Sequence, residues 1–374
     1  MQIYGQVNKA IMAWDDGFNS DAYIVDNETS TSRLGFIGQA EIKPGWRAGY
    51  RMEFDFSDAV SDEVFNGKNG DDGFPSNGTD LRIRHNYWFV DSDQLGRVSV
   101  GQQSPATDDI TVINLGAQMS NAPLHYNNNF GLRLGLAFGL TTDLTWGNFA
   151  HTVDSLRGDF VRYDSPALRG FVLSAAAGEN DVYDVALRYS GEWNSLRFAG
   201  GVGYMDSREL DFQDVRGSAS LMHIPTGIYV SVAGGARDDQ SGVVSAGDNP
   251  DFWYTQLGVK RRLLPYGDTT LYGEYARYTN WSVGRILQAD VFGPGAFADW
   301  GKLRHTEVDR WGLGIEQSFD ASALLLYVQY NHYDGTIVGN PCGTLGDCST
   351  LSGDTVSLPV EPWEAVVVGA RIQF

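Results

Sequence analysis

The chain has 374 residues, and its 47 acidic and 27 basic side chains give it a formal net charge of −20. An acidic excess of this size argues against nucleic-acid binding, which needs a basic surface. The 13% of aromatic residues argues against a disordered chain. No apolar run approaches the roughly 18 residues of a membrane-spanning helix, which excludes a helical membrane protein but not a membrane barrel, whose strands alternate.

The amino terminus reads as a strand rather than as an export signal. It begins with Met-Gln-Ile-Tyr-Gly-Gln-Val, without a basic stretch followed by an apolar stretch. Two interpretations stay open: the protein is not exported, or a signal peptide has been removed from it.

A period of two runs through residues 46–56. The even-numbered residues are apolar, and the odd-numbered residues are charged or glycine. Strict alternation of this kind predicts a strand with one apolar and one polar face. The segment is long for a soluble strand and has the length that crosses a bilayer at a tilt.

The same alternation recurs at 33–42, 81–89, 196–204 and 366–374. One face of each segment is apolar and often aromatic at its ends, while the other carries charged, polar or glycine residues. A packed soluble core would not hold those charges, whereas a barrel with lipid outside and water inside needs both faces. Only a closed sheet satisfies every backbone group in lipid, so we predict an all-β, antiparallel transmembrane β-barrel.

The connections between the predicted strands alternate in length. Short turns rich in Gly, Pro, Asp or Ser are expected at 43–45, 91–96, 165–170, 191–195, 225–227, 264–268 and 318–322. Longer polar links are expected at 15–31, 57–79, 104–156, 206–214, 237–250, 279–306 and 334–362, with a short link near 178–182. These connections separate sixteen strands, an even number typical of outer-membrane barrels. No linker divides the chain, so we predict a single domain over residues 1–374.

Residues that carry chemistry are sparse. Cys342 and Cys348 lie six residues apart, and we expect them to close a small disulfide loop, because zinc needs more ligands than two thiols. The acidic links either bind divalent cations or are simply solvated, and no calcium-loop motif accompanies them. The six histidines are scattered, and neither a nucleophile elbow nor a phosphate-binding loop occurs. We therefore expect no cofactor, no metal site and no enzymatic activity.

Several short motifs resemble those of the general diffusion porins of Gram-negative bacteria. Residues 33–38, Arg-Leu-Gly-Phe-Ile-Gly, resemble the second-strand motif of that family, and residues 95–103 resemble its fifth strand. Residues 161–166, followed by Gly-Phe at 170–171, resemble the strand-turn-strand after the family's third loop. The terminal Phe374 is shared with many outer-membrane proteins. The motifs follow the family's order and span the whole chain.

The resemblance implies a sixteen-stranded antiparallel barrel, usually a homotrimer, whose long third loop folds into the lumen and forms a constriction. That constriction loop corresponds here to residues 104–156, about fifty residues, and it lacks the Pro-Glu-Phe-Gly-Gly signature of some members. The resemblance also implies that Arg33 and Arg82 belong to a basic cluster on the wall opposite the loop.

Because alternate residues of a strand share one face, further arginines are expected beside this cluster on the polar faces of neighbouring strands. The candidates for the pore constriction are Arg33, Arg47, Arg51, Arg82, Arg84, Asp108 and Asp109. An acidic loop that faces an arginine wall creates a transverse field, which separates the paths of cations and anions. Alternatively, the arginines pair with acidic neighbours such as Glu53 and only fill the lumen.

The sequence predicts an outer-membrane porin that forms a water-filled channel for passive diffusion of ions and small hydrophilic solutes. The alternative is a channel of the same fold that selects a sugar or an anion, which inward aromatic residues would favour. Trp88, Tyr254 and Tyr272 are the candidates for that role. The expected partners are further copies in a homotrimer, outer-membrane lipid and lipopolysaccharide, and the solutes, but no nucleic acid. The expected location is the bacterial outer membrane.

Overall fold

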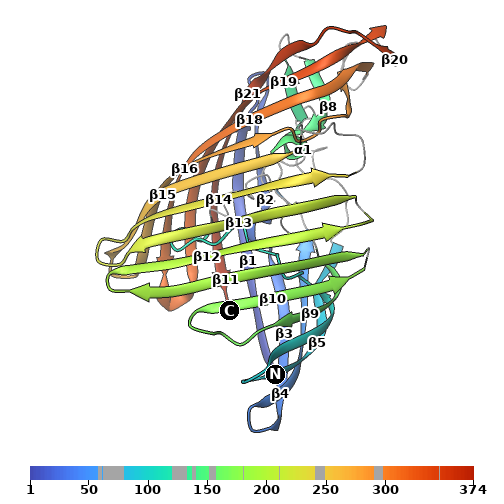
Figure 1. Cartoon of the computed structure of the whole chain (residues 1–374). Helices are drawn as coiled ribbons and strands as arrows, with labels where there is room; N and C mark the ends of the chain where they lie inside the picture. The colour runs from blue at the N-terminus through green and yellow to red at the C-terminus, as the bar shows by residue number, and fades with distance from the viewer. Residues whose placement is uncertain are drawn as a thin grey trace.

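The computed structural model describes residues 1–57, 61, 80–119, 133–136, 140–150, 157–179, 181–209, 211–240, 249–289, 298–344 and 346–374. The β-strands of this part join in one antiparallel sheet that closes on itself (Figure 1). The helical segments are short: α1 (Trp146–Phe149) and 3-10 turns at Glu28–Ser30 and Asp320–Ser322. No helix in these ranges is long and apolar enough to cross a membrane.

Each strand of the closed ring is antiparallel to both of its neighbours, and the last pairs with the first. In order around the ring the strands are β1 (Gln2–Asp15), β3 (Arg33–Lys43), β4 (Trp46–Ser57), β5 (Asp80–Ser92), β6 (Gly96–Gln103), β9 (Gly158–Asp164), β10 (Phe171–Gly178), β11 (Val182–Trp193), β12 (Leu196–Ser207), β13 (Phe212–His223), β14 (Ile228–Asp239), β15 (Asp251–Leu264), β16 (Gly267–Thr279), β18 (Ala298–Phe319), β19 (Leu324–Thr344) and β21 (Val356–Gln373). Shorter strands pair with these outside the ring order: β2 (Ser20–Asp26), β7 (Arg133–Leu136), β8 (Leu140–Thr145), β17 (Ile286–Ala289) and β20 (Asp347–Leu351).

The two ends of the chain close the ring. The Gly5 N–H donates to the Phe374 carbonyl at 3.0 Å, and the Phe374 N–H donates to the Gly5 carbonyl at 3.1 Å. The pairing of β1 with β21 continues from there to Asp15 opposite Glu364. The ring therefore has no free edge at its seam, as a sheet in lipid requires.

The short turns expected from the sequence are confirmed, because each of them joins two neighbouring ring strands at the same end of the barrel. Their glycines have the backbone conformations that tight turns need. Gly45 and Gly96 have φ values of 78° and 84°. A Cβ at Gly96 would also lie only 2.2 Å from the Asp164 carbonyl oxygen, so this turn accepts only glycine.

Three of the longer links contain strands that were not expected, and in 15–31 the strand is β2. The ranges 279–306 and 334–362, expected to be loops, contain the outer parts of β18, β19 and β21, together with β17 and β20. Figure 1 shows these long strands rising beyond the rest of the barrel. Most of the expected link 57–79 and parts of 104–156, 237–250 and 279–306 lie outside the described residues.

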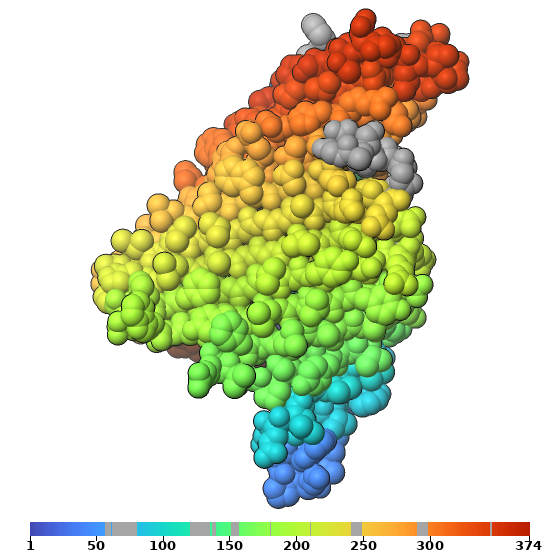
Figure 2. All heavy atoms as spheres, in the orientation of Figure 1, coloured from blue at the N-terminus to red at the C-terminus, as the bar shows by residue number. Residues whose placement is uncertain are grey.

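The predicted face of β4 is confirmed by its exposure. Tyr50, Met52 and Phe56 are 37–39% exposed on the outside, whereas Glu53 and Asp55 are at most 4% exposed on the inside. Other strands follow the same rule, and the side of the barrel seen in Figure 2 is a continuous wall of side chains from β10 to β18. An apolar exterior around a polar interior is the pattern of a barrel in lipid.

On β5 the predicted assignment of side chains to the inner and outer faces is wrong beyond Arg84. Ile83 pairs with Phe54 while His85 pairs with the next residue, Glu53, so Arg84 is the extra residue of a β-bulge. One extra residue moves every later side chain to the opposite face. Trp88, expected inside, is therefore outside and 53% exposed.

The interior of the barrel is not uniformly polar. The largest buried apolar cluster packs side chains of β7, β8 and α1 against inward side chains of β15 to β21, β1 and β2. Smaller clusters pack residues of the segment 106–117 against strands between β9 and β16. The inner faces of β3 to β6 contribute to none of these clusters, and polar side chains gather there.

Candidate functional site

A cavity of about 430 Å³ lies inside the ring, on the side of β3 to β6. It is lined by seven arginines and three aspartates: Arg33, Arg51, Arg84, Arg97, Arg157, Arg162, Arg188, Asp108, Asp109 and Asp164. The remaining lining residues are His85, Tyr87, Ser99, Gln103 and Ser104. With histidine neutral, the lining carries 7 − 3 = +4 charges, although the chain as a whole carries −20.

Glu53 of β4 organises the arginines on one side of the cavity. Its carboxylate lies 2.7 Å from Arg51, 2.9 Å from Arg84 and 3.8 Å from Arg33, and its side chain is 1% exposed. Tyr4 of β1 completes the group, since its hydroxyl donates to Glu53 at 2.7 Å and accepts from Arg51 Nε at 2.8 Å. One carboxylate thus fixes three guanidinium groups, which stay charged even when crowded by like charges.

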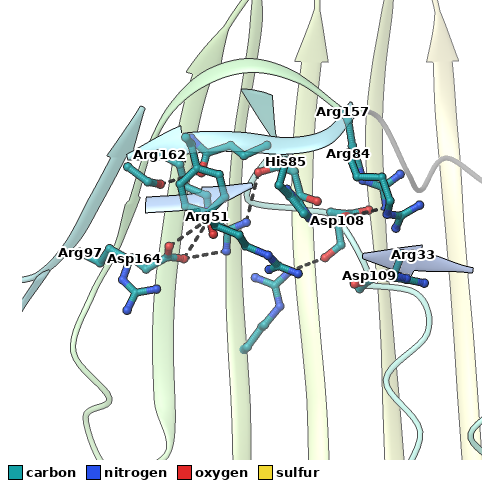
Figure 3. A pocket seen from close by; sticks show the side chains of 15 residues that line it. Arg33, Arg51, Arg84, His85, Arg97, Asp108, Asp109, Arg157, Arg162 and Asp164 are labelled. Carbon is teal, nitrogen blue, oxygen red and sulfur yellow. Dashed lines mark hydrogen bonds and ion pairs between the residues drawn. The ribbon is translucent and has the colours of Figure 1, made fainter. Parts of the chain in front are cut away.

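Strands β6 and β9 supply the arginines of another side. Arg162 binds Asp164 at 2.8 Å and donates to the Pro105 carbonyl at 2.9 Å, while Arg97 lies beside them. Figure 3 shows Arg97, Arg162 and Asp164 separated from Arg33 by the width of the cavity, with Arg51 between. Positive groups therefore surround the open space from several strands.

Asp108 and Asp109 enter the lining from the connection between β6 and β9. The Asp108 carboxylate lies 4.0 Å from Arg157, and the Asp108 carbonyl accepts a 2.6 Å hydrogen bond from Arg188. Asp109 is exposed and has a positive φ of 59°, a conformation that aspartate tolerates better than most residues. The acidic groups of this connection are accompanied by basic ones, so the arrangement is less polarised than the sequence predicts.

Hydrogen bonds tie this connection to inward side chains of the ring. Asp184 of β11 accepts from both the N–H and the hydroxyl of Thr107, at 2.6 and 2.8 Å. Glu316 of β18 accepts from the N–H groups of Gln118 and Met119, at 2.8 and 2.7 Å. Such charge-assisted bonds to buried carboxylates fix the backbone at both ends of the segment 107–119.

The structure brings five of the seven predicted constriction residues to the cavity and leaves two elsewhere. Arg47 does not line it, because it lies near the short turns and pairs with Asp91 and Asp93 at 3.0 and 2.8 Å. Arg82 does not line it either; this side chain pairs with Asp55 at 3.3 Å and with Glu28 at 3.5 Å. Cys342 and Cys348 are joined by a disulfide in the β19–β20 hairpin, with their Cα atoms 4.5 Å apart.

Sequence reasoning missed four arginines and one histidine of the lining. Arg97 and Arg162 lie in segments whose alternation was available as a signal. The alternation over 81–89 predicts His85 on the apolar outer face, but the bulge at Arg84 turns it inward. Arg157 lies in a connection without any periodic pattern, so no sequence signal points to it.

A closed antiparallel sheet with an apolar exterior and a charged cavity inside defines a channel of the membrane β-barrel class. The profile of the Gram-negative porin family matches residues 1–344. The chain therefore belongs to the Gram-negative porin family, and it is an outer-membrane channel for passive diffusion. No curated protein sequence matches it.

Solved structures of similar fold come from several bacteria. A loop-deletion mutant of OmpT from Vibrio cholerae has a TM-score of 0.59 at 15% identity. The match covers 100% of this chain and 98% of the OmpT chain. An anion-selective porin from Comamonas acidovorans has a TM-score of 0.58 at 16% identity, with coverages of 100% and 99%. The channel DcaP of Acinetobacter baumannii has a TM-score of 0.52 at 13% identity, with coverages of 100% and 96%. At these identities the likeness concerns the fold alone.

Proposed function

We propose that the arginine-lined cavity is the narrow part of the channel and that it favours small anions over cations. The observation that carries this proposal is the +4 charge of the lining in a chain of −20. Charges at a constriction act over short distances between low-dielectric walls, so they outweigh charges on remote loops. The constriction residues are then Arg33, Arg51, Arg84, Asp108 and Asp109, together with the further arginines of the lining.

The connection that starts at residue 104 is the constriction loop of this proposal, folded into the lumen. Its hydrogen bonds to Asp184 and Glu316 support that course. The membrane wall consists of the sixteen strands of the ring, from β1 to β21, and residues 1–374 form one barrel domain. The continuous order of antiparallel pairs supports the strand number.

Two kinds of partner belong to the proposal. The outward apolar side chains contact outer-membrane lipid, lipopolysaccharide or another copy of the chain, because outward residues such as Leu257 and Val202 are more than half exposed. A homotrimer is the proposed assembly; OmpT of Vibrio cholerae, which shares the fold, is described in a trimer form. Crosslinking of the protein in native membranes, with a trimer as the expected product, tests this assembly.

A channel that selects a sugar along a track of aromatic residues is less well supported. Tyr254 and Tyr272 point inward but do not line the cavity, and their hydroxyls are held by Glu274 at 2.9 Å and Gln329 at 3.1 Å. Trp88 points outward. The only aromatic side chain of the described lining is therefore Tyr87, apart from the imidazole of His85.

The experiment is a measurement of reversal potential in a planar bilayer under a gradient of potassium chloride. The wild-type protein should show chloride preference. Replacing Arg33, Arg51 and Arg84 together by glutamine should shift the reversal potential towards potassium, because Glu53 is then left as an unmatched negative charge beside the cavity.

The matched control is Arg262→Gln, which removes an exposed arginine that pairs with Asp320 at a short turn. It should leave the reversal potential unchanged. If the triple variant also leaves it unchanged while conducting normally, the cavity is not the selective part of the channel. Small currents that one sugar blocks would favour the substrate-selective alternative.

A further inference from the structure

A second, smaller closed ring of strands lies at the end of the barrel opposite the short turns. Within the described residues β7 pairs with β8, β8 with β17, β17 with β18, β18 with β19, β19 with β21, and β21 with β7. The pairs that complete the circle are Thr142 with Ala289 and Leu136 with Val360. Figure 1 shows β8 and α1 beside the outer ends of β18, β19 and β21. We call this ring of six strands the cap barrel.

The interior of the cap barrel is filled by aliphatic side chains. Each of its six strands contributes one residue that is at most 5% exposed, and all belong to one apolar cluster: Leu136, Leu144, Leu287, Leu303, Ile337 and Val360. Even an eight-stranded barrel is just wide enough for its own side chains, so a ring of six has no room for a water path. An apolar interior of this kind stays dry.

Aromatic residues form a floor below this core. Trp146 and Phe149 of α1 are 0% and 1% exposed, and the Trp146 ring lies 5.5 Å from that of Tyr333. Tyr333 in turn lies 5.1 Å from Trp363 of β21. These inward residues of the main barrel are therefore packed against α1 instead of facing water.

Polar contacts hold the hairpin of β7, β8 and α1 in this position. The Gln288 N–H of β17 donates to Asp143 at 2.8 Å, and the Ser282 hydroxyl donates to the Asn148 carbonyl at 2.8 Å. With a strand partner on each edge and a buried tryptophan at its end, the hairpin is part of the wall rather than a swinging lid.

We propose that the cap barrel is a fixed plug that closes the side of the channel mouth above β15 to β21. Solutes are thereby confined to the side of β3 to β6, where the arginine-lined cavity lies. The size limit of the channel is then set by the cap barrel together with the cavity, and solutes meet the arginines before any apolar part of the wall. Leu144, Trp146 and Leu303 are the residues that exclude solutes from the closed side.

Cysteine labelling tests where water and ions pass. Both native cysteines are in the disulfide, so the chain has no free thiol. Single cysteines at Leu144, Leu303 and Tyr87 are treated in a conducting bilayer with a negatively charged methanethiosulfonate reagent. Current should fall for Tyr87→Cys and stay constant for Leu144→Cys and Leu303→Cys, whose thiols should react only after unfolding. Loss of current at Leu144→Cys or Leu303→Cys would place the aqueous path through the cap barrel and overturn the proposal.

A second measurement uses the hairpin itself. Replacing residues 133–149 by a short Gly-Ser linker should raise the single-channel conductance and admit larger neutral sugars in liposome swelling. Trp146→Ala is the milder variant and should raise the conductance less. Its matched control is Trp193→Ala, at a side chain that is 74% exposed near a short turn. This control should leave the conductance constant. Unchanged conductance and size limit in a folded linker variant would contradict the plug. The anion preference of the arginine-lined cavity is measured by reversal potential, whereas the plug is tested by conductance and size limit. Failure of one proposal is therefore seen independently of the other.

Discussion

Arg310 of β18 and Glu274 of β16 form an ion pair that is entirely removed from solvent. Arg310 Nη1 lies 3.0 Å from Glu274 Oε1, and the two side chains are 0% and 1% exposed. Glu274 also accepts from the Tyr254 hydroxyl and from Gln256, so its oxygens are well satisfied. Burial of both charges makes each dependent on the other.

Removing one partner of this pair should therefore be costly. Glu274→Gln leaves the guanidinium of Arg310 buried without a counter-charge, and we expect a loss of about 3–5 kcal/mol in the free energy of unfolding. Urea titration of the protein in lipid vesicles measures it. Asp320→Asn, which breaks the exposed pair with Arg262, is the control and should change little. Equal stability of the two variants would show that the buried pair does not stabilise the barrel.

The bond between Thr107 and Asp184 predicts the behaviour of the proposed constriction loop. Asp184→Asn removes the charge that strengthens two hydrogen bonds, which should weaken this attachment by about 1–2 kcal/mol. We expect more frequent current fluctuations in single-channel recordings. The control is Asp181→Asn, at an exposed residue of the same region with a positive φ of 50°. Equal current fluctuations in the two variants would argue against anchoring by Asp184.

The bulge on β5 turns Tyr87 inward and Trp88 outward, the reverse of the faces that the sequence predicts. Trp88→Arg places a charge on the outer face, where it should cost about 1–4 kcal/mol depending on its depth in the bilayer. Tyr87→Arg adds a charge to the cavity and should leave folding in vesicles intact while strengthening anion preference. The heat-modifiable shift of folded barrels on gels reports folding. Equal folding yields for the two variants would contradict the assigned faces.

The charge preference of the channel should depend on ionic strength. The screening length falls from about 10 Å at 0.1 M salt to about 3 Å at 1 M, so the arginines act over a shorter range at high salt. The ratio of chloride to potassium permeability should approach one as salt is raised. A ratio that stays constant over this range would point to binding at a discrete site instead of a diffuse field.

The disulfide of the β19–β20 hairpin should stabilise only that hairpin. The loop it closes spans six residues, so its contribution is smaller than the roughly 3 kcal/mol of a 15-residue loop. Replacing Cys342 and Cys348 by serine should leave conductance unchanged and speed proteolysis near residues 343–347. A change in conductance would instead connect the hairpin tip to the pore.

Much of the ring could be predicted from the sequence because its strands obey one simple rule. Lipid outside and water inside force a period of two, and residues such as Val202 and Tyr204 follow it without interruption. The rule fails at Arg84, because a bulge adds one residue without any mark in the sequence. Every side-chain assignment beyond that point on β5 is inverted.

The cap barrel could not be predicted for a different reason. Strands β7 and β17 are only four residues long. The outer part of β19 mixes Gly, Pro and polar residues with one apolar pair, Ile337 and Val338. Such segments resemble polar loops in any local pattern. They become strands because distant partners, Val360 for Leu136 and Thr142 for Ala289, provide the hydrogen bonds. Arg157 and Arg188 reach the cavity through the same kind of long-range arrangement.

The seam between Gly5 and Phe374 has a consequence for biogenesis. The first strand finds one of its partners only after β21 has been made, so the contact that closes the barrel joins residues 5 and 374. Contacts of this separation form slowly, because the whole intervening chain must be ordered first. Until then β1 offers an unpaired edge that other chains could join. Assembly of this protein is thus all-or-none at its final step, and a chain that ends before β21 is an open sheet and an aggregation hazard.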